Sequence, residues 1–81
     1  MITSSQIRAG RALVDMSQST LAALANVSLP TIKRMERLGP GRSSADNVDA
    51  VQRSLEAAGV EFIAANGGGA GVRLKRDVAD G

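Results

Sequence analysis

The chain has 81 residues, a formal net charge of +2, and neither cysteine nor histidine. These absences exclude disulfides, thiolate chemistry, imidazole acid–base catalysis and the usual zinc sites, and the length predicts one small domain near the lower limit for an unaided core. No segment approaches the roughly 20 apolar residues of a membrane span and the N-terminal residues lack the apolar run of a signal peptide, so we expect a cytoplasmic protein without membrane contact.

The positive charge is concentrated in the first half of the chain. Residues 1–42 contain six basic and two acidic side chains, a net +4, whereas residues 43–81 contain four basic and six acidic side chains, a net −2. A basic half of this kind suits a polyanionic partner such as a nucleic acid. An ordinary solvated surface is the alternative that charge alone leaves open.

The first predicted helix covers residues 4–15. Ile7, Gly10, Arg11 and Val14 recur at the i, i+3, i+4 and i+7 spacing of one helical face. Because a charge on a buried stripe is costly unless it is compensated, Arg11 needs an acidic partner elsewhere in the fold.

Two short helices follow, joined by a tight turn. Ser17 is a typical N-cap for the first of them, and Asn26 is typical of the left-handed residue that ends a helix. The second helix covers about residues 28–38, with Ser28 as its cap and Pro30 in its first turn, where the missing N–H costs no hydrogen bond.

The helix at 28–38 is amphipathic, with an apolar edge formed by Ile32 and Met35. Lys33, Arg34 and Arg37 lie on the opposite side. The pattern therefore predicts a helix whose inner edge is buried and whose outer face is basic.

The period of the pattern changes in the C-terminal part. A fourth helix is predicted after the Ser43-Ser44 cap and before Gly59, with one apolar face formed by Val48, Val51, Leu55 and Ala58. Residues 60–76 contain two alternating segments separated by a glycine cluster, which predicts a β-hairpin. Residues 77–81 are expected to form a flexible tail.

Two helices in this arrangement, with a basic outer face on the second, match the helix-turn-helix of DNA-binding proteins. The sequence resembles the Xre family of Cro and phage-repressor type over residues 4–58. The residues that carry the resemblance are Gln18, Leu21, Ala22, Val27, Ser28, Thr31, Ile32 and Glu36. The usual member of this family has five helices, whereas this chain offers four helices and then strands. We therefore expect a mainly α fold, with a four-helix lambda-repressor-like domain over residues 1–59 and a C-terminal β-hairpin.

The resemblance also implies a partner for the arginine of the first helix. Related repressors pair an arginine at this position with a glutamate near the end of the recognition helix, and the matching residues are Arg11 and Glu36. Each lies on an otherwise apolar stripe, so we expect a structural ion pair. Two separately solvated side chains are the alternative.

The start of the recognition helix carries an apolar pair where related proteins contact base edges. Leu29 and Pro30 cannot form hydrogen bonds to bases with their side chains, but they can contact the C5-methyl group of thymine. The alternative for Leu29 is packing into the turn or against a partner.

Hydrogen bonds to bases are expected from Arg34 and Lys33, either of which can reach guanine O6 and N7. For Lys33 a phosphate contact is an equal alternative. Further phosphate contacts are expected from Gln18, Ser28, Thr31, Arg37 and Arg42. The function predicted by these residues is that of a transcriptional regulator, a repressor that binds a palindromic operator in double-stranded DNA.

A palindromic operator requires a homodimer, and the hairpin is the expected interface. An exposed strand edge with Val72 and Leu74 would pair with its copy, and Phe62, the only aromatic residue, would anchor it. The alternative is an intramolecular hairpin packed on the fourth helix, and we expect the hairpin to do both.

Two other functions are alternatives to DNA binding. An enzyme is disfavoured, because the serines have no activating histidine and the glycine-rich segment lacks the Gly-Lys-Ser/Thr ending of a phosphate-binding loop. No cofactor or metal is expected. An antitoxin or anti-regulator is the stronger rival, with a second protein bound through the hairpin and the acidic tail residues Asp77 and Asp80.

Overall fold

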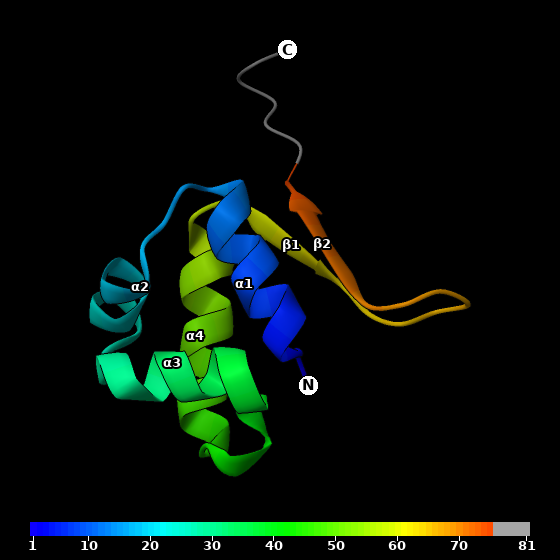
Figure 1. The fold of residues 1–81 in the computed structure, drawn as a ribbon. Coiled ribbons are helices and arrows are strands. Elements are labelled where there is room, and N and C mark those ends of the chain that lie inside the picture. Colours follow the sequence, from blue (N-terminus) through cyan, green and yellow to red (C-terminus); the bar gives the residue numbers. More distant parts are fainter. Residues whose placement is uncertain (76–81) are drawn as a thin grey trace.

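The computed structural model describes residues 1–75 and shows a helical body from which a β-hairpin projects (Figure 1). The predicted fold class, four helices followed by a hairpin, is confirmed. The elements are α1 (Ser4–Leu13), α2 (Gln18–Ala25), α3 (Leu29–Leu38), the short 3-10 helix η1 (Pro40–Arg42), α4 (Ala45–Ala57), β1 (Val60–Ile63) and β2 (Gly71–Leu74). The predicted tail, residues 77–81 with Asp77 and Asp80, lies outside the described residues.

The predicted caps set the helix boundaries. The Ser17, Ser28 and Ser44 side chains each accept a hydrogen bond from the backbone N–H three residues later, at 3.0, 3.2 and 3.1 Å. Asn26 ends α2 in the left-handed conformation, with φ 55° and ψ 45°. The prediction for the first helix was two residues too long, because Asp15 has a positive φ of 52° and α1 ends at Leu13.

The core is formed by apolar side chains from all four helices, from β1 and from Ile2 ahead of α1. Its buried members are Ile2, Ile7, Leu21, Ala22, Ala25, Ile32, Met35, Val48, Val51, Leu55 and Val60. Ala58 does not belong to it: the prediction placed this residue on the buried face of the fourth helix, but it is the C-cap of α4 and is exposed.

The hairpin packs on α1 and α4 of its own chain, in agreement with the alternative of an intramolecular hairpin packed on the fourth helix. Its strands are antiparallel, with Val60 opposite Leu74 and Phe62 opposite Val72. Alternation puts these four side chains on one face of the hairpin. Val60 is fully buried there and packs against Gly10 of α1. A Cβ atom added at Gly10 would lie 3.4 Å from the Val60 Cγ1 atom.

Gln6 joins α1 to the hairpin end that is farther from α4. Its side-chain amide donates hydrogen bonds to the carbonyls of Ile63 and Gly71, at 3.1 and 2.9 Å, and its Oε1 accepts from the backbone N–H of Thr3 at 2.9 Å. Because the Gln6 side chain is buried, these hydrogen bonds take the place of those that its amide would make with water. Within residues 1–75, no helix combines the length and the apolar character needed to cross a membrane.

Candidate nucleic-acid interface

A bidentate ion pair connects the inner side of α3 to α1. The Arg11 Nε atom lies 2.6 Å from Glu36 Oε2, and Arg11 Nη2 lies 2.8 Å from Glu36 Oε1. Glu36 is only 4% exposed. The hydrogen bond to Glu36 raises the pKa of Arg11 above its ordinary value, although desolvation by burial opposes this shift. The predicted structural pair is therefore confirmed, and the alternative of two solvated side chains is wrong.

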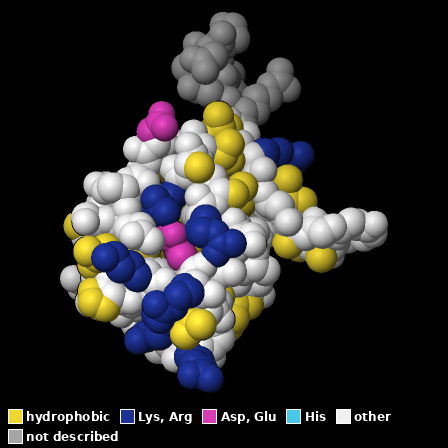
Figure 2. All heavy atoms as spheres, viewed as in Figure 1, with side chains coloured by type: hydrophobic (Ala, Val, Ile, Leu, Met, Phe, Trp, Pro, Cys, Tyr) yellow, Lys and Arg dark blue, Asp and Glu magenta, His cyan; other side chains and the backbone are white. Residues whose placement is uncertain are grey.

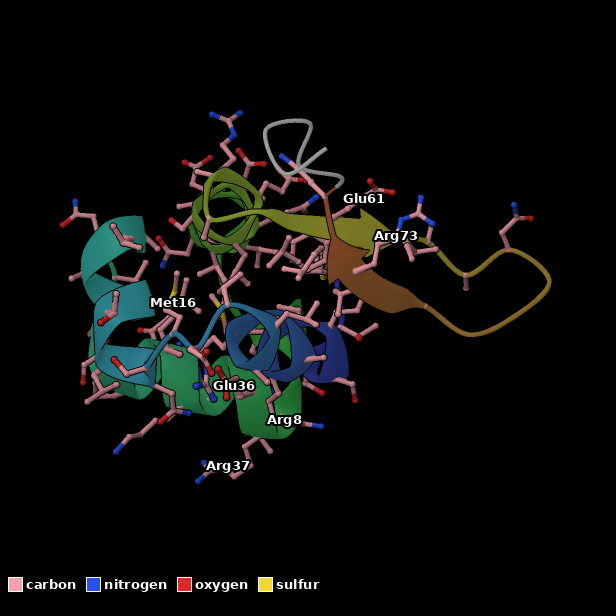
Figure 3. All side chains as sticks on the ribbon, turned by 90° about the horizontal axis from the view of Figure 1, so that it is seen from above. Arg8, Met16, Glu36, Arg37, Glu61 and Arg73 are labelled. Atoms are coloured by element: carbon pink, nitrogen blue, oxygen red, sulfur yellow. The ribbon has the colours of Figure 1, made fainter. Side chains whose placement is uncertain are left out.

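Three further hydrogen bonds extend this pair into a network. Gln18 at the start of α2 donates to Glu36 Oε1 at 3.1 Å, Arg8 donates to the Glu36 carbonyl, and Arg11 also donates to the Met16 carbonyl at 3.0 Å. Figure 3 shows Glu36 between the ribbons of α1 and α3, with Arg8 on the same side of α1. The last turns of α3 are thus tied to both α1 and the start of α2.

Gln18 was predicted as a phosphate contact. In this structure its amide is half-buried and bonded to Glu36. A phosphate contact by this side chain would share the amide with Glu36, which has two other partners on Arg11. The phosphate contact stays a prediction, and in this structure the Gln18 amide binds the Glu36 carboxylate.

The outer face of α3 is basic, as predicted. Lys33, Arg34 and Arg37 are exposed, and Arg42 of η1 is exposed just beyond the end of the helix. Among the described residues, none of these four cations has a carboxylate within salt-bridge distance. Figure 2 shows the Lys and Arg side chains gathered over α3 and the adjoining part of α1, around one small acidic area.

The first turn of α3 has one half-buried and one exposed apolar residue. Leu29 packs against the core, which agrees with the alternative that it packs inside the protein. Pro30 is exposed. The hydroxyl groups of Ser28 and Thr31 lie 2.7 Å apart, and the Ser28 hydroxyl also caps the helix. A contact with a thymine methyl group, if made, therefore falls mainly to Pro30, and the Ser28 and Thr31 phosphate contacts stay predictions.

The three residues predicted for a dimer interface differ in exposure. Phe62 and Val72 are half-buried and pack against the core of their own chain. Leu74 is 54% exposed. The hairpin face that carries Phe62 and Val72 is thus largely occupied within one chain, and the open part of the hairpin is β2 with Leu74.

Two residues whose hydrogen bonds join distant parts of the fold, Gln6 and Arg8, were not predicted from the sequence. Gln6 had a signal, because Thr3 and Gln6 have the spacing of a capping box, and the structure contains both of its hydrogen bonds, at 2.9 and 3.1 Å. Arg8 had none, since its contact with the Glu36 carbonyl depends on how α1 crosses α3.

Comparison with family models and with curated proteins finds no match to this chain.

Proposed function

We propose that this protein is a sequence-specific DNA-binding transcriptional regulator, a repressor that occupies a palindromic operator as a dimer. In this proposal α2 and α3 form a helix-turn-helix unit resembling that of the Xre family, and α3 is the recognition helix. The observation that carries the proposal is the outer face of α3, where Lys33, Arg34 and Arg37 are exposed without acidic partners among residues 1–75.

The inner side of the same helix supports the proposal. Base recognition requires a recognition helix of fixed orientation, because each hydrogen bond to a base edge depends on its geometry. Glu36 receives hydrogen bonds from Arg11, Gln18 and, at its carbonyl, Arg8. These contacts restrain α3 relative to α1 and α2 while its basic face stays in solvent.

The basic residues divide into two roles. Arg34 is the best candidate for base recognition, because its planar guanidinium matches guanine O6 and N7. Arg37 and Arg42 follow along α3 and η1 and suit the phosphate backbone, as do the N-terminal N–H groups of α2 and α3. Lys33 suits either role.

The test is selection of bound fragments from a genomic DNA library, followed by sequencing, for the wild type and for Arg34→Ala. We expect a palindromic motif in the wild type and the loss of one guanine preference in the variant, with a cost of about 1–3 kcal/mol on the selected site. Arg53→Ala is the matched control, because Arg53 is also an exposed arginine but lies on α4, paired with Asp49 at 3.0 Å.

Two outcomes separate the roles further. Arg37→Ala should weaken binding to all sequences about equally and reduce the salt dependence by about one counterion. Replacing a thymine of the selected motif by uracil should weaken binding if Pro30 contacts its methyl group. Weak, salt-sensitive binding without any motif in the wild type would refute the proposed function.

A further inference from the structure

The strand β2 has an open edge. In the described residues the sheet has two strands, so β2 is paired on one side only. The other strand, β1, contributes the fully buried Val60 and packs on α4 and α1. β2 packs on α1, and Val72 packs against the core, but its residues Arg73 and Leu74 are exposed.

The register shows which backbone groups are free at this edge. The Lys75 N–H donates to the Gly59 carbonyl at 2.7 Å, and hydrogen-bonded pairs alternate along an antiparallel ladder. Arg73 and Gly71 therefore direct their N–H and C=O groups towards β1. Val72 and Leu74 direct theirs away from it, as donors and acceptors for another strand.

We infer that β2 pairs antiparallel with β2 of a second copy of this chain, about a two-fold axis at Val72, to make a continuous four-stranded sheet. This deepens the proposed function, on which the use of the dimer at an operator rests, by naming the edge and the register. A lone two-stranded sheet is marginal, and three or more strands over an apolar face are much more stable.

Three registers can pair an outward-facing residue of β2, Val72 or Leu74, with one of its copy. The charged side chains favour the register centred on Val72. Pairing Val72 with Leu74 would place Arg73 directly opposite its own copy, and pairing Leu74 with itself would place Arg73 opposite Lys75. Both put like charges face to face, which is destabilising. Pairing Val72 with itself places Arg73 opposite Gly71 and leaves each Arg73 bound to Glu61 of its own chain, at 2.9 Å (Figure 3).

The same register is favourable for the apolar side chains. It forms a row across the sheet from Phe62 and Val72 of one copy to Val72 and Phe62 of the other, and it brings Leu74 opposite Ala70. Leu74 is one of five large hydrophobic side chains that are exposed in the described part of the chain. Pairing would cover it, which explains an apolar residue at an otherwise open edge.

The first experiment is sedimentation velocity over a concentration series for the wild type, Leu74→Pro and Leu74→Val. Proline removes the outward N–H at this position without touching the ladder to β1, whereas valine keeps the N–H and the strand preference. We expect dimers for the wild type and Leu74→Val, and at least a tenfold weaker dimer for Leu74→Pro with an unchanged circular dichroism spectrum. A monomeric wild type, or a Leu74→Pro dimer as tight as that of the wild type, would overturn the inference.

The register is tested by single cysteines, because the described chain has no cysteine of its own. With Val72 opposite its copy, the two Cα atoms lie about 5.5 Å apart, within disulfide range. The two copies of residue 74 are then about 14 Å apart. Val72→Cys should form a disulfide-linked dimer on mild oxidation and Leu74→Cys should not. Efficient cross-linking of Leu74→Cys, or preferential mixed dimers from the two variants together, would overturn the register.

DNA binding distinguishes this inference from the proposed function. A wild type that dimerises and selects a palindromic motif, but whose dimer is neither weakened by Leu74→Pro nor cross-linked through Val72→Cys, would overturn the interface and leave the proposed function standing. A wild type that dimerises and cross-links as described but selects no DNA sequence would support the interface and overturn the function.

Discussion

The ion pair between Arg11 and Glu36 offers the most direct test of how this fold is held together. We predict that Arg11→Met strongly destabilises the protein. The variant keeps an apolar stem of similar length but leaves the Glu36 carboxylate buried. Among residues 1–75, its remaining side-chain partner is then the Gln18 amide at 3.1 Å. Leaving one member of a buried pair uncompensated costs about 3–5 kcal/mol.

This cost is large for so small a domain. Proteins of this size are stable by about 5–15 kcal/mol, and each kcal/mol shifts the Tm by about 4–8 °C. We therefore expect Arg11→Met to lower the Tm by at least about 12 °C. Urea unfolding followed by circular dichroism measures the change as a lower midpoint at unchanged slope.

The double variant Arg11→Met/Glu36→Leu removes both charges. Replacing a complete buried pair by apolar side chains is often neutral or stabilising, so this variant should recover most of the stability lost by Arg11→Met. Because it also removes the contacts of Glu36 with Arg11 and Gln18 that restrain α3, we expect it to bind the operator more weakly than the wild type even at recovered stability.

The control is Arg53→Met, which breaks an i,i+4 pair on α4 whose arginine side chain is 77% exposed. A pair of this kind contributes at most about 0.5 kcal/mol. If Arg11→Met lowered the stability no more than Arg53→Met does, the role of the buried pair would be refuted. Since the pKa of Arg11 is raised in the folded state, its stabilising effect is fully present below the ordinary pKa of arginine, and we expect no loss through this group between about pH 6 and 10.

Substitutions at three further positions test local features of the fold by the same urea titration. Gly10→Ala should stabilise by about 0.5–1 kcal/mol, because alanine is favoured over glycine within a helix and its Cβ would meet Val60 at an ordinary contact distance of 3.4 Å. Gly10→Leu should destabilise the protein. Equal effects of the two substitutions would contradict the close packing of α1 on β1. Gln6→Leu should cost about 1–3 kcal/mol and speed amide exchange in the hairpin more than in α4, since two part-buried carbonyls each lose a hydrogen bond from Gln6. Uniform exchange would contradict the Gln6 link. Asn26→Ala should cost about 1 kcal/mol and Asn26→Gly much less, because only the alanine is strained at φ 55°; equal costs would show that the left-handed conformation is not the reason for asparagine.

Much of the local structure was predictable from the sequence, because its signals act over three or four residues. Serine caps, an asparagine in the left-handed conformation and a proline in a first turn each satisfy or spare backbone groups of their own helix. The same holds for the outward direction of Lys33 and Arg34, which follows from the helical period once Ile32 and Met35 are buried. The pairing of Arg11 with Glu36 was reached by resemblance and by the cost of leaving a buried charge unpaired.

The sequence by itself determined the order of elements, the basic outer face of α3 and the demand for a partner to Arg11, since these depend on neighbouring residues and helical period. Only the tertiary structure decided where side chains distant in sequence meet. The fold brings the Gln6 amide to carbonyls 57 and 65 residues further along the chain, and the Gln18 amide to Glu36. It also packs Phe62 and Val72 against the core of their own chain. The physical reason is that such contacts depend on how the helices and the hairpin cross, and no local pattern encodes those crossings.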